Sequence, residues 1–107
     1  MTCYAIGHLR EIAMNAEIVA YLQGMDATLT PFDGRFIVHG ARASVLEGDF
    51  TGDLIVIAFP SRPAAEGWYR SARYQALLPL RQRNASGDVI LIDGVDADHR
   101  ATDILTN

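Results

Sequence analysis

Lysine is absent from this chain of 107 residues, and its nine basic side chains are outnumbered by thirteen acidic ones. The formal net charge at pH 7 is −4. A surface that binds DNA or RNA normally carries clustered lysine and arginine, because contacts with the phosphate backbone supply much of the binding free energy. We therefore expect no nucleic-acid partner.

The chain also has a single cysteine, Cys3, and no stretch that reaches the roughly 18 apolar residues of a membrane span. One cysteine cannot form an internal disulfide, which agrees with a reducing compartment. The first ten residues lack the basic start and long apolar run of a secretion signal. These absences predict a cytoplasmic protein with no membrane partner. A catalytic Cys3 would need an activating base, and none can be located in the sequence.

The common ligand and cofactor motifs are missing as well. The sequence contains no Gly-x-Gly-x-x-Gly, no phosphate-binding loop, no Gly-x-Ser-x-Gly and no paired cysteines. Nucleotide, serine-hydrolase and zinc sites therefore have no support. The run Asp96-Ala97-Asp98-His99 has the residue types of a metal site, but it has no matching third group of ligands. We expect neither a metal nor a cofactor.

What the chain does contain is enough apolar sequence for one folded domain. Its residues are 50% hydrophobic and 21% charged, which is typical of a soluble globular protein. Short apolar runs predict strands over 4–9, 35–39, 54–59 and 89–92, with a continuation of the second strand over 43–47. Turn formers over 48–53 then predict a hairpin. We expect one domain over residues 1–94 and a polar tail over 95–107.

The first predicted helix follows Asn15, whose side chain can cap free N–H groups. Its apolar stripe repeats with the period of a helix and should cover the sheet; it consists of Ile18, Tyr21, Leu22, Met25 and Leu29. Gly24 slightly weakens the prediction of a helix, because glycine is a poor helix former. The pair Asp33-Gly34 closes the helix, since glycine reaches the left-handed conformation that a sharp exit requires.

The second helical region spans residues 61–81. Ser61 is placed to cap it, and Ser71 repeats the capping chemistry ten residues later. Pro79 disfavours helical geometry at Leu78. We therefore expect two or three short helices, and a bend that turns Tyr69, Ser71, Tyr74 and Arg81 toward a common rim.

The order strand, helix, strand, strand, helix, strand predicts an α+β fold, the ferredoxin-like βαββαβ plan with an antiparallel sheet and helices on one face. Water on the other face would require polar residues at alternate strand positions, yet 54–59 and 89–92 are apolar on both sides. The same face of another copy would supply the missing cover with closed symmetry. We expect a homodimeric α/β barrel. Ile104 and Leu105 in the tail either reach across to the partner or belong to a frayed end.

One set of residues in both helical regions and at the strand ends matches a known family pattern; it consists of Tyr4, Tyr21, Gly34-Arg35-Phe36, Glu47-Gly48, Phe59-Pro60-Ser61, Ala65, Trp68-Tyr69, Ser71, Tyr74-Gln75-Ala76-Leu77 and Pro79-Leu80-Arg81. Through these residues, nearly the whole chain up to Gly94 resembles DUF1330, a bacterial family of unknown function within the dimeric α/β-barrel superfamily. The chain departs from the family pattern at Asp33, where the family has glycine, and at Ala58, where it has glutamate. The resemblance implies a fold and a homodimer. The superfamily includes cofactor-independent oxygenases, isomerases and haem-binding proteins, so the fold leaves the reaction open.

Four residues of the second helical region are candidates for ligand binding. The guanidinium of Arg81 can hold a carboxylate or phosphate by two parallel hydrogen bonds, with Tyr74 and Ser71 beside it. Tyr69 and Tyr74 can each donate to a ligand oxygen. The alternatives are that Arg81 pairs with a carboxylate or faces solvent, and that both tyrosines belong to the core.

Glu47 and His39 are candidates for moving a proton. Glu47 would act as a base if a cleft desolvated it, and otherwise is a solvated charge at a strand end. His39 lies on a strand, where a lone histidine is more often simply hydrogen-bonded, and the same holds for His8. Two functions remain open: a cofactor-independent enzyme acting on a small anionic metabolite, or a non-catalytic dimer that binds one. A base that faces an Arg81-lined cavity would favour the enzyme.

Overall fold

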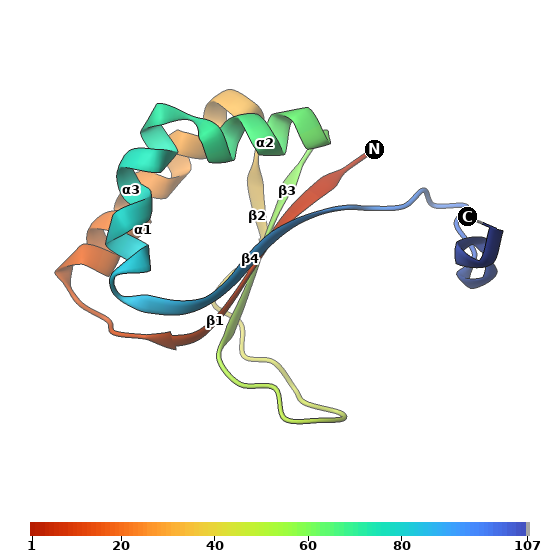
Figure 1. The fold of residues 1–107 in the computed structure, drawn as a ribbon, viewed down its shortest axis with the longest axis horizontal. Helices are drawn as coiled ribbons and strands as arrows, with labels where there is room; N and C mark the ends of the chain where they lie inside the picture. Colours follow the sequence, from red (N-terminus) through yellow and green to blue (C-terminus); the bar gives the residue numbers. More distant parts are fainter. Residues whose placement is uncertain (107) are drawn as a thin grey trace.

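A four-stranded antiparallel sheet carries three helices on one side in the computed structural model, which describes residues 1–106 (Figure 1). The elements in chain order are β1 (Cys3–Ile12), α1 (Ala16–Leu29), a 3-10 turn η1 (Thr30–Phe32), β2 (Arg35–Val38), β3 (Asp53–Phe59), α2 (Arg62–Arg70), α3 (Ala72–Gln82), β4 (Ala85–Asp93) and a 3-10 segment η2 (Ala101–Thr106). The strands lie in the order β2-β3-β1-β4. The predicted βαββαβ fold is confirmed. β1 and β4 are longer than their apolar runs because their ends pair with each other.

The two faces of the sheet follow from the alternation of side chains along each strand. Cys3, Ala5 and Leu9 of β1 face the helices and are buried. Their neighbours Tyr4 and Ile6 face the other way, and so do the residues paired with them on β3 and β4. We call the covered side the inner face. The outer face includes Tyr4, Ile6 and His8 on β1, Leu54, Val56 and Ala58 on β3, and Asp88, Ile90 and Ile92 on β4.

Helix α1 begins and packs as its sequence predicts. The side-chain oxygen of Asn15 accepts hydrogen bonds from the backbone N–H of Glu17 and Ile18, at 3.0 and 3.1 Å. Gly24, although a poor helix former, is needed for packing between α1 and α3. A Cβ at this position would lie 2.8 Å from Cδ1 of Leu77, so the glycine lets α1 and α3 approach closely.

The exit from α1 differs from the prediction in one respect. Asp33, with φ of 55°, takes the left-handed conformation that was expected of Gly34. Aspartate tolerates this conformation better than most residues. Gly34 is required for space, because a Cβ there would lie 2.6 Å from Cε1 of the buried Phe59 ring.

Helices α2 and α3 are separated at Ser71, whose extended backbone breaks the helix. Ser61 caps α2 by accepting from the N–H of Ala64, and Ser71 caps α3 by accepting from the N–H of Tyr74. The division into short helices is confirmed. The expectation that Leu78 leaves helical geometry is wrong, since α3 continues through Pro79 to Gln82. Leu78 is buried in the core, and this packing outweighs the local preference.

Residues 39–52 form a long loop that projects from the sheet, and we call it the arm (Figure 1). The predicted continuation of the strand over 43–47 is wrong, because no residue of the arm is in a strand. β2 and β3 pair antiparallel as the two strands of the predicted hairpin, but the whole arm joins them rather than a turn over 48–53 alone. Gly40, Gly48 and Gly52 have positive φ and turn the chain out of the sheet plane. The base of the arm is fixed by His8, which stacks on Phe50 at 4.5 Å between ring centroids.

The core lies between the inner face and the helices, and its largest fully buried side chains include Trp68, Tyr74 and Phe59. Trp68 Nε1 donates to Thr28 Oγ1 at 2.9 Å, and Thr28 in turn donates to the carbonyl of Met25 at 2.7 Å. The one tryptophan of the chain is thus fixed as a packing residue. Over residues 1–106, the helices are too short or too polar to cross a membrane.

Candidate functional site

A cavity of about 250 Å³ lies between the inner face of the sheet and helices α1 and α3. It is walled mainly by apolar side chains, among them Leu9, Ile18, Met25, Ile57 and Trp68. This volume is slightly below the roughly 300 Å³ at which pockets for drug-sized molecules begin. The space therefore suits a small organic molecule that is largely apolar.

Arg81 brings a positive charge into this apolar space. It is only 9% exposed and lines the cavity from α3. Within the described residues, no carboxylate lies within ion-pair distance of its guanidinium. Burial opposes the charge, but the neighbouring Tyr74 and Tyr21 favour it more strongly and raise the pKa of Arg81. The guanidinium therefore stays charged, and with no carboxylate beside it the cavity is electrostatically suited to an anion.

Two tyrosine hydroxyls accompany the guanidinium. Tyr21 on α1 and Tyr74 on α3 join their hydroxyl oxygens at 2.9 Å, and the Arg81 Cζ lies 6.0 Å from the centre of the Tyr21 ring. Burial, followed by the nearness of Tyr74, raises the pKa of Tyr21 well above its usual range. Tyr21 therefore stays protonated, and it can donate a hydrogen bond to an anion held by Arg81.

Aromatic packing fixes the position of Tyr74. Its ring lies 4.2 Å from that of Trp68 and 5.6 Å from that of Tyr69, between centroids, and the residue is 2% exposed. Tyr69 contacts this cluster but does not line the cavity. Ser71 does not line it either, because its hydroxyl accepts from the N–H of Tyr74 and donates to the carbonyl of Trp68. The structure thus brings together Arg81 and Tyr74 of the four candidates, and the other two support Tyr74.

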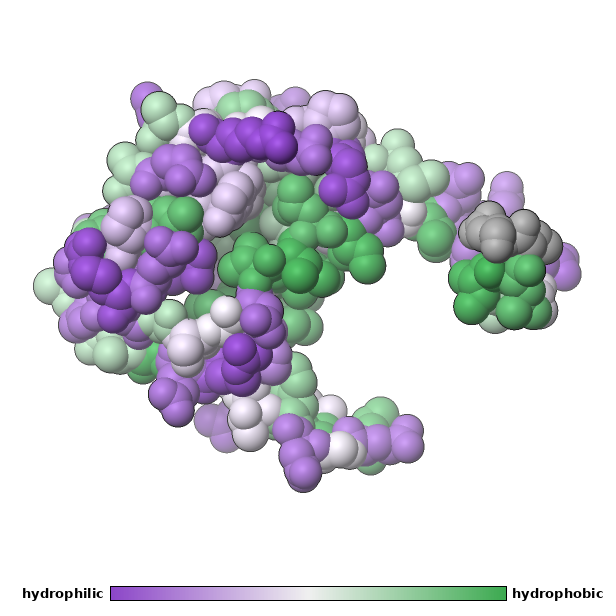
Figure 2. Space-filling view, viewed as in Figure 1, coloured by the Kyte–Doolittle hydropathy of each residue, from purple (hydrophilic) through white to green (hydrophobic). Residues whose placement is uncertain are grey.

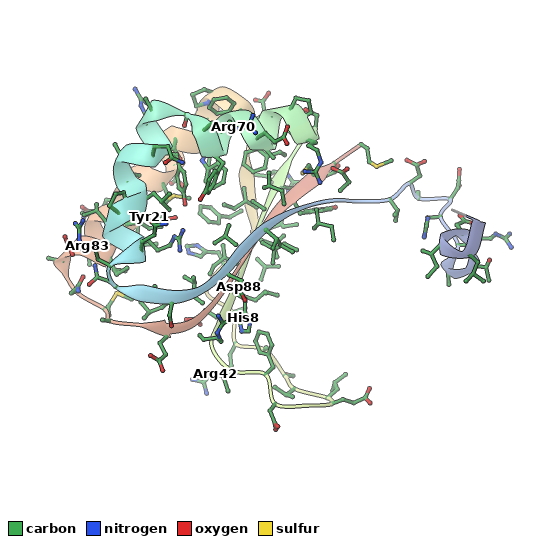
Figure 3. The ribbon with its side chains drawn as sticks, in the orientation of Figure 1. His8, Tyr21, Arg42, Arg70, Arg83 and Asp88 are labelled. Atoms are coloured by element: carbon green, nitrogen blue, oxygen red, sulfur yellow. The ribbon has the colours of Figure 1, made fainter. Side chains whose placement is uncertain are left out.

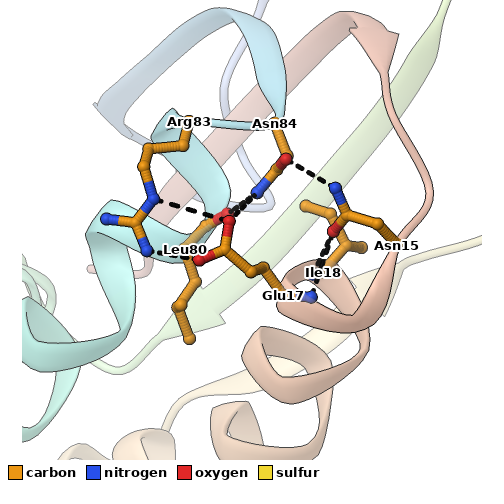
Figure 4. A network of polar contacts seen from close by, with 6 residues as sticks. All are labelled: Asn15, Glu17, Ile18, Leu80, Arg83 and Asn84. Carbon is orange, nitrogen blue, oxygen red and sulfur yellow. Dashed lines mark hydrogen bonds and ion pairs between the residues drawn. The ribbon is translucent and has the colours of Figure 1, made fainter.

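A polar network joins the start of α1 to Arg83 and Asn84, the two residues that directly follow α3 (Figure 4). Glu17 accepts from Arg83 Nη2 at 2.5 Å and from Asn84 Nδ2 at 2.9 Å. Asn84 Oδ1 accepts from the side chain of Asn15 at 2.6 Å. The Arg83 guanidinium beside Glu17, with Asn84, holds the pKa of that carboxyl below its usual value. These contacts fix the helices that carry Tyr21 and Arg81 relative to each other.

The candidates for proton transfer lie in different places. His39 is exposed, lines the cavity and stacks on Phe36 with ring centroids 4.4 Å apart, so it stands where the cavity meets solvent. Glu47 is exposed on the arm and does not line the cavity. His8 faces outward and bonds through Nε2 with the carbonyl of Thr51 at 2.7 Å, at the base of the arm (Figure 3). Only His39 of these three borders the ligand space.

Two residues at this site were not among the sequence candidates. Tyr21 was expected only to pack on the sheet, and the pairing of its hydroxyl with Tyr74 depends on how α1 and α3 are placed. Asp53, an exposed residue at the start of β3, lines the cavity near His39 and Gly40. Asp53 pairs with Leu9 and therefore lies on the inner face. The alternation of side chains along β3 could have indicated this position from the sequence, had the start of the strand been predicted at Asp53.

Other reactive groups do not form a second site in the part of the chain described. No group of three or more His, Cys, Asp or Glu among residues 1–106 is arranged to hold a metal ion. Burial, followed by a contact with Asp93, raises the pKa of the Cys3 thiol. Cys3 therefore stays protonated and lacks the thiolate that a nucleophile requires.

Solved structures of other proteins share this fold. An RPA0582 protein of unknown function from Rhodopseudomonas palustris is 16% identical with a TM-score of 0.66, over 89% of this chain and 83% of that chain. A dimeric ferredoxin-like protein of unknown function from Jannaschia sp. CCS1 is 10% identical with a TM-score of 0.68, over 88% and 100%. SnoaB, a cofactor-independent oxygenase from Streptomyces nogalater, is 9% identical with a TM-score of 0.56, over 92% and 96%. These likenesses establish the fold.

No curated protein matches the chain at a significant level. The family described as Domain of unknown function (DUF1330) matches residues 2–95, which include all four strands and all three α-helices. Together with the ferredoxin-like fold, this match confirms the family indicated by the sequence motifs. The chain belongs to the DUF1330 family.

Proposed function

We propose that this protein binds a small organic molecule with one negative charge and an apolar body, in the cavity between the helices and the inner face. The observation that carries the proposal is Arg81, a buried cation that lines an apolar cavity and has no carboxylate partner in the described chain. A bound anion would supply the missing counter-charge, and it would offset the cost of burying the guanidinium.

The lining restricts the class of anion. Arg81 is accompanied by two hydroxyls, those of Tyr21 and Tyr74, and by apolar walls. One guanidinium neutralises a single charge, so a carboxylate or an enolate fits better than a doubly charged phosphate monoester. The ligand's apolar part would contact Ile18, Met25 and Ile57. Sugars and other strongly polar molecules would leave hydrogen-bonding groups unpaired there.

We also propose that the protein is a homodimer in which the outer faces of two sheets pack together. Ile90 and Ile92 on this face are 49% and 48% exposed, and they lie beside Tyr4 and Ile6 in one apolar patch. A contiguous apolar patch on a folded domain commonly marks an interface. The Jannaschia protein, which shares the fold, is dimeric, and this supports a dimer here.

Catalysis is a second candidate function, and one observation favours it. His39 borders the cavity and can take a proton from a bound molecule whose charge is held at Arg81. Such an enzyme would need no cofactor, and SnoaB, which shares the fold, is a cofactor-independent oxygenase. Glu47, which lies outside the cavity, would not be the base. Binding without catalysis remains the better supported function, because it requires only Arg81 and the cavity.

The test is a thermal-shift titration with benzoate, other small monocarboxylates and phenyl phosphate, on the wild type and two variants. Arg81→Met removes the charge and keeps much of the side-chain volume. Arg73→Met makes the same change at an exposed position of the same helix. A ligand at a hundred times its Kd adds about 2.7 kcal/mol to the free energy of unfolding.

We expect one or more monocarboxylates to raise the Tm of the wild type and of Arg73→Met, and to leave that of Arg81→Met unchanged. Without ligand, Arg81→Met should stay within about 1 kcal/mol of the wild type, because an apolar side chain of similar volume replaces a charged group that lies in apolar surroundings. An equal response of both variants to carboxylates would refute the role of Arg81. Strong unfolding of Arg81→Met alone would mark the residue as structural.

A further inference from the structure

The cavity that holds Arg81 also has polar groups at its mouth, Asp53 and His39. Arg81 is 9% exposed, whereas Asp53 and His39 are exposed residues that line the same space. Asp53 is not paired with Arg81, because in the described chain no carboxylate lies within ion-pair distance of that guanidinium. The cavity therefore has a buried positive charge and, apart from it, a negative charge where it opens to solvent.

The mouth lies where the arm joins the sheet, and both of its polar residues are held in place. The ring of His39 stacks on Phe36, which also lines the cavity, with centroids 4.4 Å apart. Asp53 is the first residue of β3 and follows Gly52, which has φ of 89°. A Cβ at Gly52 would overlap the carbonyl oxygen of Leu9, so only glycine fits this turn against β1. This close contact fixes the backbone from which Asp53 projects.

The protein leaves the hydrogen-bonding capacity of the mouth unused. Within residues 1–106, the Asp53 carboxylate makes no hydrogen bond or ion pair, and the ring nitrogens of His39 make no hydrogen bond. An ionised carboxylate is an acceptor only. Asp53 therefore favours a ligand that presents a donor at the mouth, and it repels a ligand that presents a second negative charge there.

We propose that the ligand of this cavity is a small acid with a hydroxyl group at the end remote from its carboxylate. The inference rests on the proposed function, in which Arg81 holds the carboxylate. The hydroxyl donates to the carboxylate of Asp53, and the apolar part of the ligand contacts Leu9 and Ile55, the neighbours of Asp53 on the inner face. The opposite orientation is excluded, because it would place the two carboxylates together.

An ammonium group is the alternative donor, and the cavity disfavours it. A zwitterion would bring two charges out of water into apolar surroundings, and each charge carries a desolvation cost. Asp53 is exposed, so an ion pair at this position would be screened by solvent and would offset little of that cost. A neutral hydroxyl gains a hydrogen bond from the same carboxylate and loses less hydration.

The proposed dimer leaves this mouth open. Figure 2 shows apolar surface between the arm and the C-terminal segment, residues 95–106, where the molecule is hollowed. The half-exposed Ile90 and Ile92 belong to the outer face, which the second copy would cover. Asp53 pairs with Leu9 and lies on the inner face instead. The path for a ligand past Asp53 and His39 is therefore compatible with dimerisation.

Matched pairs of acids test the proposal. Benzoate is compared with para-hydroxybenzoate, and phenylpropionate with para-hydroxyphenylpropionate, because each pair differs only in the hydroxyl. Terephthalate carries a second carboxylate in place of the hydroxyl of para-hydroxybenzoate. The Kd of each acid is measured by isothermal titration calorimetry.

Three variants accompany the wild type in these titrations. Asp53→Leu keeps the shape of the side chain and removes its oxygens, and Asp53→Asn removes the charge but keeps an acceptor. Asp49→Leu is the control, since Asp49 is an exposed residue of the arm that does not line the cavity. It causes the same change in net charge as Asp53→Leu, and Asp53 is itself exposed, so all three variants should fold.

We expect at least one hydroxylated acid to bind the wild type at least fivefold more tightly than its parent acid. This preference should fall below twofold in Asp53→Leu and persist in Asp49→Leu. Terephthalate should bind the wild type at least tenfold more weakly than benzoate, and this difference should shrink at least threefold in Asp53→Asn, where the repulsion is absent.

The outcomes separate this inference from the proposed function. Parent acids that bind through Arg81, without any preference for their hydroxylated partners, would overturn the inference and leave the binding of monocarboxylates intact. A hydroxyl preference that persists in Asp53→Leu would also overturn it, because another residue would then accept the hydrogen bond. Failure of every acid to bind the wild type would refute the proposed function, and this inference with it.

Discussion

The two faces of the β-sheet carry apolar side chains of similar kinds, and they meet different surroundings. On the inner face, Ala5, Ile57 and Phe59 are buried under the helices. On the outer face, Ile90 and Ile92 remain about half exposed, and the arm and the C-terminal segment extend beyond them. One chain of this length therefore covers one face of its sheet, and the covered face is the one that holds the cavity.

Because the two faces differ in this way, ligand binding and dimerisation are assigned to alternate residues of the same strand. Because successive side chains point to opposite faces, neighbouring residues of β4 belong to different surfaces. Val89 lines the cavity, whereas Ile90 lies on the outer face. A change at one position should affect ligand binding, and a change at the next should affect association. The comparison of the faces can thus be tested one residue at a time.

The largest effect is expected from Ile90→Asp. A charge placed twice in an apolar, symmetric interface has no partner, so the dimer dissociation constant should rise at least about a hundredfold, or 2.7 kcal/mol. Val89→Asp is the matched change on the inner face. It should leave the dimer intact and abolish the binding of carboxylates, because it adds a negative charge to the cavity of Arg81. Sedimentation and thermal shift measure the two outcomes, and a dimer that tolerates Ile90→Asp would contradict the role of the outer face.

The helices that cover the inner face could be predicted from the sequence, because their starts are marked by capping residues and their faces by apolar periodicity. The caps at Asn15, Ser61 and Ser71 lie where short polar side chains precede apolar periodicity, and each cap is present. The arm was mispredicted for the opposite reason. Residues 43–47 have the composition of a strand, but a strand needs a partner, and the glycines at both ends of the arm direct it away from the sheet.

The site was only half predictable from sequence. Arg81 and Tyr74 were selected for their chemistry, and both line the cavity. Tyr21 was not selected, because its helical spacing is fully explained by packing on the sheet. Its hydroxyl meets that of Tyr74 only because Gly24 allows α1 to approach α3. Contacts between elements far apart in sequence depend on such details of packing, which periodicity does not encode.

A smaller effect is expected from the glycines of the inner layer. Gly34→Ala places a Cβ 2.6 Å from Cε1 of the buried Phe59, and should destabilise the fold by about 1–3 kcal/mol. Gly7→Ala is the matched control, because a Cβ there meets no atom closer than 4.0 Å. Gly7 lines the cavity, so its alanine variant should keep its stability and bind bulky carboxylates less tightly. Urea unfolding of both variants measures the difference, and equal stabilities would mean that the helical layer can shift to accommodate Gly34→Ala.

The smallest change in stability is expected from a substitution of Glu17, an exposed residue at the start of α1. The Arg83 guanidinium and Asn84 lower the pKa of Glu17 below its ordinary value of 4.5. The ionised carboxylate therefore stabilises the fold above pH 4.5, and this stabilisation is lost as the pH falls through the lowered pKa. Glu17→Gln should have a lower Tm than the wild type near neutral pH, and the difference should shrink in acid. Glu11→Gln, which removes an exposed carboxylate of β1 outside this network, is the control for the loss of one negative charge. If the Glu17→Gln difference were the same at every pH, packing of the side chain rather than its charge would hold α1 against α3.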